Sequence, residues 1–311
     1  MRIKHVFFGL LLTGLLLLSG IASGEMYQQV TYAGKQYEYN NRIRTILFVG
    51  VDAAGDLETT NRYTLAPRAD TIELVIMDGY QKKISILTIS RDTMTEIRRY
   101  TMDGTDRGTY VSHLGYAYTF GDGGKVSCLN LVEAVSNLLG GIPIHEYVVV
   151  SEGGIVLGNQ LVGGVQVEVP NDDLMEKYPE MVAGALVSLS DSNVCEFVRF
   201  RDTEKAFSNR SRMERAQSFS VAFISQLREK VIVSPSAMWS KIESFGNVMH
   251  TSITRNQYLK LADELAGYSI SKEDCVALGG TDVSGQIHDE VWLDGDEVKQ
   301  LCLHLFYYDQ E

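Results

Sequence analysis

The chain has 311 residues, of which 45% are hydrophobic and 22% are charged, with 28 glycines and five prolines. This composition is typical of a globular protein, and it excludes disordered, collagen-like and small disulfide-stapled classes. The net charge of −12 argues against a general affinity for nucleic acid or anionic lipid surfaces. A basic binding site must therefore be local.

The first 24 residues have the pattern of a targeting segment. Arg2 and Lys4 precede an apolar run over residues 6–23, which is about 27 Å long as a helix and just enough to span a bilayer. The positive N-terminal side predicts that the rest of the chain is exported. Residues 22–24 are small, as a signal peptidase requires. Residues 1–24 are thus a signal anchor or a signal peptide, and we expect an extracytoplasmic protein with a single N-terminal membrane pass, or a secreted one.

The remaining elements alternate between strand and helix patterns. A hairpin or linker is expected over residues 25–44, with alternating stretches on both sides of Ala33-Gly34. Buried strands are predicted at 45–51, 71–77 and 84–89 from their length and β-branched content. Further strands are expected at 147–150 and 165–169, and helices at 127–139, from about 152, at 253–266 and at 294–305. This order predicts one α/β/α sandwich domain over 45–311 with a central mixed β-sheet.

Four cysteines are present, at positions 128, 195, 275 and 302, and their spacing matches no metal pattern. An exported chain can oxidise such cysteines, but buried free thiols are an equal alternative. If one bridge forms, Cys275 with Cys302 is the expected pair.

Five arginines lie between residues 199 and 215. A strand over 194–201 places Arg199 and Arg201 on one face, and the capping-box spacing of Ser211 and Glu214 predicts a helix that begins near Arg212. Cations are disfavoured at a helix N-terminus, and an anion bound there removes that conflict. Because arginine suits bidentate phosphate or carboxylate binding, the cluster indicates such a site. The alternative is a set of solvated or salt-bridged surface arginines.

Several short motifs occur in a fixed order between about residues 45 and 230. They are Gly50-Val51-Asp52, Arg68-Ala69-Asp70-Thr71-Ile72, Leu87-Thr88-Ile89-Ser90-Arg91-Asp92-Thr93, Gly115-Tyr116-Ala117-Tyr118, Leu161-Val162-Gly163-Gly164-Val165, Val198-Arg199-Phe200-Arg201 and Arg212-Met213-Glu214-Arg215-Ala216-Gln217. Together they resemble the LytR-CpsA-Psr family of extracytoplasmic, membrane-anchored proteins of Gram-positive bacteria.

The resemblance implies a phosphotransferase that moves a glycopolymer from a polyprenyl pyrophosphate carrier to peptidoglycan and depends on magnesium. Its implied partners are the lipid-linked glycan, peptidoglycan and, through the N-terminal segment, the membrane. The implied pyrophosphate-binding residues are Arg68, Arg91, Arg199, Arg201, Arg212, Arg215 and Gln217. The implied metal ligands are Asp52 and Asp70, and the implied catalytic residues are Asp70, Arg91 and Asp92, with Asp70 or Asp92 activating the acceptor hydroxyl. Phosphoryl transfer needs aligned groups and neutralised charge, which such residues supply.

The sequence also departs from the family. The usual lysine ahead of the Tyr-Ala-Tyr segment is missing from Val111-Ser112-His113, and the usual acidic residue three positions before Arg212 is Asn209. His113 itself is expected to be a loop or core residue. Two alternatives therefore stay open: a non-catalytic binding or regulatory protein of the envelope, and a pyrophosphate hydrolase.

A polyprenyl carrier requires an apolar cavity that opens next to the arginines. Apolar residues of two predicted strands and one predicted helix can supply a wall: Leu74, Ile76, Ile86, Leu87, Leu131, Val135 and Leu139. The alternative is that these side chains pack on one another without a void. The segment 231–311 is expected to complete the domain without a chemical role.

Overall fold

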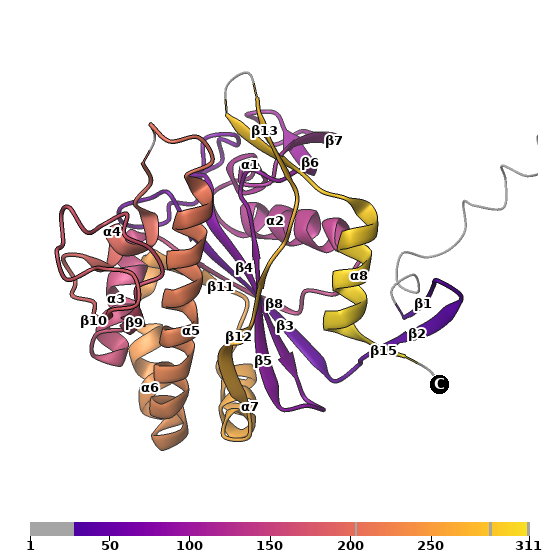
Figure 1. Ribbon diagram of the computed structural model, residues 1–311. Helices are drawn as coiled ribbons and strands as arrows, with labels where there is room; N and C mark the ends of the chain where they lie inside the picture. Colours follow the sequence, from indigo (N-terminus) through magenta and orange to yellow (C-terminus); the bar gives the residue numbers. More distant parts are fainter. Residues whose placement is uncertain (1–27, 203, 286–287, 310–311) are drawn as a thin grey trace, which may run out of the picture.

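The computed structural model describes residues 28–202, 204–285 and 288–309 (Figure 1). The predicted targeting segment, residues 1–24, lies outside the described residues. Within the described ranges, no helix combines the length and the apolar character that a membrane crossing requires.

A six-stranded sheet forms the centre of the molecule, in the order β11-β8-β3-β4-β5-β12. Its strands are β3 (Ile43–Val51), β4 (Ala69–Asp78), β5 (Lys83–Ile89), β8 (Glu146–Val150), β11 (Met249–Thr251) and β12 (Ser269–Ala277). The β3·β8 and β5·β12 pairs are parallel, and the other three pairs are antiparallel. The predicted central mixed sheet is confirmed.

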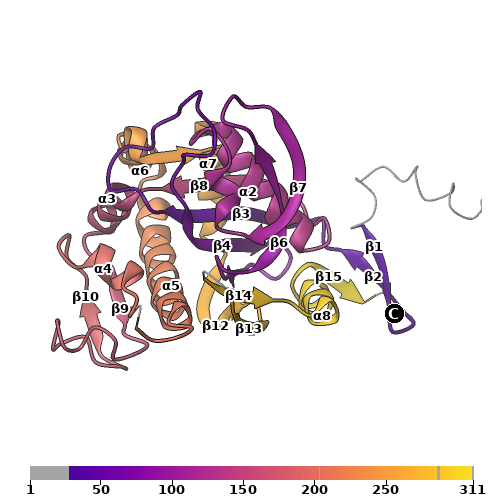
Figure 2. The same cartoon turned by 90° about the horizontal axis from the view of Figure 1, so that it is seen from above.

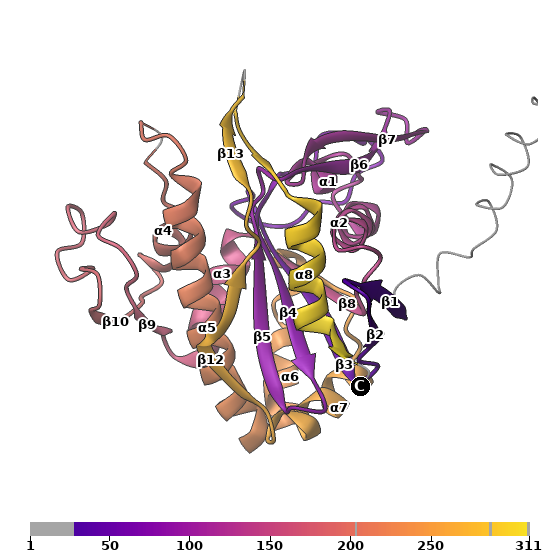
Figure 3. The same cartoon turned by 45° about the vertical axis from the view of Figure 1, so that its right-hand side comes forward.

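Helices cover both faces of this sheet (Figures 1 and 3). One face carries α1 (Tyr116–Thr119), α2 (Lys125–Leu138) and α8 (Gly295–Phe306). The other carries α3 (Glu152–Val162), α4 (Val194–Arg199), α5 (Asn209–Val233), α6 (Pro235–Glu243) and α7 (Arg255–Leu265). The smaller strands are paired as β1 (Gln29–Tyr32) with β2 (Lys35–Tyr39), β6 (Met94–Tyr100) with β7 (Asp106–His113), β9 (Gln166–Glu168) with β10 (Leu186–Ser188), and β13 (Thr281–Ser284) with β14 (Asp289–Trp292).

The two sheet faces bury different clusters because side chains alternate along a strand. Leu47 and Leu74 belong to the larger core, in which the sheet packs against Leu131 of α2 and Phe306 of α8. The opposite face, with Val75 among its residues, packs against α5 and α7. The predicted strands and helices around this core are confirmed.

The β3·β4 ladder contains one irregularity, at the start of β4. Gly50 pairs with Thr71, whereas Val51 pairs with Ala69, so Asp70 is the extra residue of a β-bulge. A bulge bends the strand and redirects the side chain at that point. The sequence therefore places a carboxylate where the sheet geometry is locally broken.

The N-terminal hairpin is confirmed, and it is joined to the C-terminal end of the described chain. Strand β2 pairs with β15 (Tyr307–Asp309) as well as with β1, and Figure 2 shows these strands beside the C-terminus. The residues from 29 to 39 are thus tied to the main domain by backbone hydrogen bonds.

Two local predictions are wrong, and the two alternatives for the cysteines are decided. Residues 194–199 form helix α4 and not a strand, because Val194, Phe197 and Val198 are buried at helical spacing. Helix α5 begins at Asn209, and the Ser211 hydroxyl donates a hydrogen bond back to the Ser208 carbonyl at 3.1 Å, so Ser211 and Glu214 form no capping box. All four cysteines are free, which confirms the alternative of free thiols and leaves no bridge between positions 275 and 302.

Candidate active site

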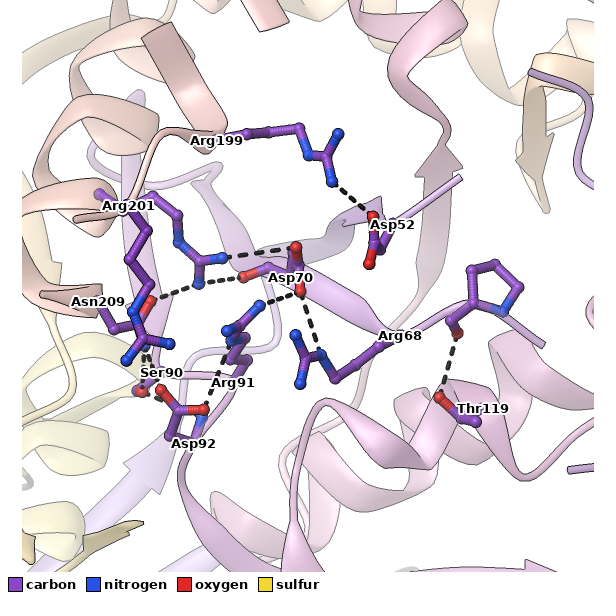
Figure 4. A network of polar contacts seen from close by, with 12 residues as sticks. Asp52, Arg68, Asp70, Ser90, Arg91, Asp92, Thr119, Arg199, Arg201 and Asn209 are labelled. Atoms are coloured by element: carbon purple, nitrogen blue, oxygen red, sulfur yellow. Dashed lines mark hydrogen bonds and ion pairs between the residues drawn. The ribbon is translucent and has the colours of Figure 1, made fainter. Parts of the chain in front are cut away.

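The polar motifs meet at one end of the central sheet. Because β3 and β5 are both antiparallel to β4, the residues that follow β3 and β5 lie beside those that precede β4. The backbone N–H of Asp52 donates a hydrogen bond to the Arg68 carbonyl at 2.9 Å, and Arg91 follows the end of β5. Figure 4 shows the side chains of these residues converging at this edge.

Asp70 is the centre of this group. Its Oδ1 accepts from Arg91 Nη1 and lies 3.4 Å from Arg68 Nε, and its Oδ2 lies 3.6 Å from Arg212 Nη1. Burial raises the pKa of the Asp70 carboxyl, but Arg91, Arg212 and Arg68 together hold it below the ordinary value. Asp70 is therefore ionised at neutral pH and fixes three guanidinium groups around one point.

Arg212 is a buried cation, with a side chain that is only 3% exposed. Its Nη2 donates to the Asp70 carbonyl at 2.8 Å and to the Asn209 side chain. Burial and the nearby Arg91 lower the pKa of Arg212 to about 9, so the group still carries its charge at neutral pH. A buried guanidinium beside other guanidinium groups favours an anion at the same place.

Arg199 and Arg201 also lie at this edge of the sheet, although α4 replaces the predicted strand (Figure 4). Arg199, the last residue of α4, pairs through Nη2 with Asp52 Oδ1 at 2.5 Å and through Nη1 with Glu152. Arg201 donates from Nε to the Ser208 hydroxyl at 2.9 Å and from Nη2 to Asp289 Oδ2 at 3.1 Å. Both side chains are about one quarter exposed, which leaves them accessible to a ligand.

Two acidic partners in this group were not predicted from the sequence. Glu152 opens α3, and Asp289 opens β14. Each is a single acid in no motif, so only the three-dimensional arrangement identifies it. The contact of Asp289 with Arg201 also corrects the expectation that segment 231–311 has no part in the site.

Asp92 lies beneath the arginines and is 6% exposed. Asn209 donates from Nδ2 to Asp92 Oδ2 at 2.8 Å and to the Ser90 hydroxyl at 3.0 Å. The same Asn209 accepts from Arg212 through its side-chain oxygen. Asn209 thus links the buried Asp92 to the arginine cluster and positions Arg212.

Two predicted binding residues lie apart from this group. Arg215 is fully buried and points to the loops around α4, where it donates to the Phe197 carbonyl at 3.0 Å and pairs with Asp173 at 2.6 Å. The structure therefore gives Arg215 a structural role in place of the predicted ligand contact. Gln217 donates from Nε2 to Thr88 Oγ1 at 3.1 Å, at the sheet surface below Arg212.

An apolar cavity of about 270 Å³ begins next to the cluster and runs between the sheet and helices α3, α5, α6 and α7. Its lining near the arginines includes Thr71, which follows Asp70, and Val198, which precedes Arg199. Deeper in the cavity the lining is almost entirely apolar, including Phe48, Val75, Phe223 and Leu261. Cavity and arginine cluster thus adjoin.

The cavity is present, but the wall predicted for it is wrong. Leu74, Ile76 and Leu87, with Leu131, Val135 and Leu139 of the α2 region, pack against one another in the larger core. Ile86 is buried as well and does not line the cavity. The cavity lies on the opposite face of the same sheet, lined by the alternate residues of β3 and β4.

Comparison with known proteins identifies the family to which this chain belongs. The model of the LytR_cpsA_psr family matches residues 18–301, which is most of the chain. The chain belongs to the LytR-CpsA-Psr family. The resemblance of its motifs to that family is thus confirmed.

Relatives and solved structures of LytR-CpsA-Psr type agree with this assignment. The protein named "Polyisoprenyl-teichoic acid--peptidoglycan teichoic acid transferase TagV" of Bacillus subtilis is 26% identical over 291 residues, which is 86% of this chain and 69% of the relative. A TagU of the same type from Halalkalibacterium halodurans is 34% identical over 124 residues, 40% of this chain and 34% of that protein. The crystal structure of B. subtilis TagV shares the fold with a TM-score of 0.62 and 22% identity, covering 85% of this chain and 96% of that chain. The structure of TagT bound to LI-WTA shares it with a TM-score of 0.63 and 18% identity, covering 92% of this chain and 98% of that chain.

Asp52 and Asp70 are the residues of this LytR-CpsA-Psr domain that could hold a magnesium ion shared with a ligand. Within residues 28–202, 204–285 and 288–309, no group of three or more histidine, cysteine, aspartate or glutamate side chains is arranged to hold a metal. Asp52, whose side chain is half exposed, and Asp70 supply two carboxylates at one edge of the sheet. Magnesium is usually held by one or two carboxylates together with substrate phosphates, and this donor set matches that pattern.

Proposed function

We propose that this chain is a phosphotransferase that moves a phosphate-linked glycopolymer from a polyprenyl pyrophosphate carrier to peptidoglycan. The relatives described above are named as transferases of teichoic acid from a polyisoprenyl carrier to peptidoglycan. The same chemistry suits this chain because its site joins a phosphate-binding region to a lipid-binding region.

The main support for the proposal is the position of the arginine cluster beside residues that line one end of the apolar cavity. Arg68, Arg91 and Arg212 surround Asp70, and the next residue, Thr71, already lines the cavity. A pyrophosphate held by the arginines leaves its lipid tail in the cavity, where burial contributes about 0.8 kcal/mol for each CH₂ group. A soluble nucleotide has no group that would use such a cavity.

In the proposed reaction, an acceptor hydroxyl oxygen attacks the phosphorus that carries the glycan. The bond from that phosphorus to the bridging oxygen breaks, a phosphodiester forms, and polyprenyl phosphate leaves. The arginines neutralise the charge on the transferring and leaving groups, which is the main demand of phosphoryl transfer. Asp70 is the proposed acceptor of the hydroxyl proton, because it lies at the centre of the arginines that hold the pyrophosphate, whereas Asp92 Oδ2 is already bonded to Asn209. Asp92 then acts as a positioning residue for Arg91 and Asn209.

Magnesium is part of the same proposal, with Asp52 and Asp70 as its protein ligands. When bound there, the ion supplies charge neutralisation for the pyrophosphate oxygens. Both carboxylates also orient arginines in this chain, Asp52 through Arg199 and Asp70 through Arg91. The two acids therefore have a role in arranging the cationic groups besides that of metal ligands.

We also propose that the domain works outside the cytoplasm, at the membrane. The positive residues Arg2 and Lys4 ahead of the apolar run 6–23 support this topology. A lipid-linked donor and a peptidoglycan acceptor are both accessible at the extracytoplasmic face of the cell membrane.

The experiment is a transfer assay with the purified full chain in detergent. A polyprenyl pyrophosphate-linked glycan with a radiolabel in the glycan is incubated with peptidoglycan oligomers and magnesium, and products are separated and identified by mass spectrometry. The proposal expects polyprenyl phosphate and a glycan–peptidoglycan phosphodiester in equal amounts. Labelled glycan phosphate released to water would instead identify a hydrolase, and tight donor binding with no turnover would identify a binding or regulatory protein.

A further inference from the structure

One acidic side chain lies in the wall of the apolar cavity, away from the arginine cluster. Glu73 on β4 is fully buried, and the cavity lining includes it together with Thr71, Val75 and Met77 of the same strand. These four residues alternate along β4, so they point to the same face. Glu73 is three residues from Asp70, about 10 Å along an extended strand.

The Glu73 carboxyl is only partly satisfied by its surroundings. Its Oε2 accepts a hydrogen bond from the Ser220 hydroxyl of α5 at 2.5 Å, whereas Oε1 has no hydrogen-bond partner among the residues that the structure describes. Burial raises the pKa of the Glu73 carboxyl to about 7, against the smaller opposing effects of the Ser220 and Thr88 hydroxyls. A carboxylate oxygen without a hydrogen-bond partner in an apolar cavity carries an uncompensated desolvation free energy, unless the group is neutral or contacts a ligand.

Among the residues that the structure describes, no lysine, arginine or histidine contributes to the pKa shift of Glu73. Its cross-strand neighbours are Phe48 on β3 and Thr88 on β5, and its hydrogen-bond partner is Ser220 on α5. The titratable neighbour on β12 is Cys275, whose pKa burial raises to about 11, so it is an uncharged thiol at neutral pH. Protonation is therefore the available route to neutralise Glu73 in this wall.

We propose that Glu73 is a ligand-contacting residue of the cavity, and that it must be protonated when the cavity takes the tail of an anionic prenyl lipid. The inference rests on the proposed function, because it assumes that the lipid phosphates are held by the arginines. An ionised Glu73 would place a carboxylate oxygen that lacks a hydrogen-bond partner against the alkyl tail, three residues along β4 from Asp70 at the phosphate-binding end, where buried charges are poorly screened. The neutral acid removes both costs, so binding of the lipid is linked to proton uptake at this residue.

The test compares the affinity of two probes in the full chain between pH 5.5 and 8.5. The first probe is a C15 prenyl pyrophosphate, and the second is inorganic pyrophosphate, which has no tail. Glu73→Gln keeps the shape of the side chain and cannot ionise. The phosphates of each probe also titrate in this pH range. Their effect is the same for both proteins, so it cancels in the ratio of wild-type to variant affinity for the same probe.

For the prenyl probe, this ratio should fall by up to about tenfold per pH unit above pH 7, and it should stay constant for inorganic pyrophosphate. A matched control is Glu146→Gln: Glu146 is a buried acid in the same sheet, but it is hydrogen-bonded to Ser252 and Gln257 and lies outside the cavity lining. Its pH profile should follow the wild type. If Glu73→Gln does not fold, Glu73→Leu replaces the acid by an apolar group and should give the same profile.

The outcomes separate this inference from the function on which it rests. A wild type that binds inorganic pyrophosphate but gains nothing from the prenyl tail at any pH would overturn the lipid donor itself. Tight prenyl binding with the same pH profile in the wild type and in the Glu73 variant would overturn the role of Glu73 alone.

Discussion

Arg199 and Asp52, 147 positions apart in the chain, form an ion pair with Nη2 and Oδ1 2.5 Å apart. The pair joins the end of α4 to the end of β3, and Glu152 holds the other side of the same guanidinium. Most arginines of the site are likewise held by acids of this chain. A phosphate ligand must therefore compete with carboxylates for cations that are already oriented.

This competition makes a prediction for Asp52→Asn. Without magnesium, the variant should bind inorganic pyrophosphate at least as tightly as the wild type, because Arg199 loses one competing carboxylate. With magnesium, the wild type should gain affinity and the variant should gain much less, because one metal ligand is gone. Titration calorimetry with and without the ion measures both effects. A variant that keeps the full magnesium-dependent gain would contradict the assignment of Asp52 as a ligand.

Arg201→Lys should weaken pyrophosphate binding by about ten- to one-hundredfold, because lysine offers a point charge where arginine offers a planar fork of donors. The variant should remain folded, since Arg201 is partly exposed. The matched control is Arg210→Lys, at a nearby exposed arginine that pairs with Asp282 outside the cluster. Equal affinity for the Arg201 variant and the control would exclude Arg201 from the site.

Arg215→Met tests the structural role of that arginine. It removes a buried cation that is bonded to Asp173, Asn171 and two backbone carbonyls, and Asp173 is left without its partner. The free energy of unfolding should fall by about 3 kcal/mol, whereas an exposed control such as Arg210→Ala should change it by less than about 0.5 kcal/mol. Chemical denaturation measures the change. A stable variant with lost pyrophosphate affinity would restore Arg215 to the binding set.

The raised pKa of Glu73 also predicts a pH dependence of stability. Between its ordinary value of 4.5 and about 7, the folded chain keeps the Glu73 proton and the unfolded chain loses it. This contribution to stability is complete below pH 4.5, declines as the pH rises to 7, and amounts to about 3 kcal/mol. As the pH rises through this range, the unfolding free energy of the wild type should therefore fall relative to that of Glu73→Gln. A constant difference between the two proteins from pH 4.5 to 7.5 would show that Glu73 has an ordinary pKa.

The sequence was sufficient to predict strands β3, β4, β5 and β8 of the central sheet and helices α2, α3, α5, α7 and α8, but not the two edge strands β11 and β12. The runs 45–51, 71–77 and 84–89 are long, apolar and β-branched, so their strand structure depends little on context. Residues 194–201 are short, and their alternating pattern fits a strand as well as a helix. The burial of Val194, Phe197 and Val198 decides for the helix, and burial is a property of the tertiary packing.

The motifs brought Arg68, Asp70, Arg91, Arg199, Arg201 and Arg212 to one site, as predicted, but they did not locate the cavity. Strand β4 is largely apolar on both faces, so the pattern could not show which face is packed. Glu73 was the one signal in the sequence for the position of the cavity. It shares a face of β4 with Val75 and Met77, and a charged residue at such a position indicates that this face is not packed entirely as hydrophobic core. Arg215 differs from Arg212 by less than one helical turn, and only the carbonyls around α4 determine that it points away from the site.

The arginine cluster and the cavity are proposed to form one binding site for a lipid pyrophosphate. The most direct measurement is the affinity gained by adding a C15 prenyl tail to pyrophosphate, in the wild type and in Gly158→Leu. Gly158 lines the cavity, and a Cβ there would meet Phe223 at an ordinary 3.6 Å, so leucine extends into the void without a backbone clash. We predict a gain of at least about one hundredfold in the wild type. Most of this gain should be lost in the variant, whose affinity for inorganic pyrophosphate should be unchanged. An equal gain in both proteins, or none in the wild type, would contradict this proposal.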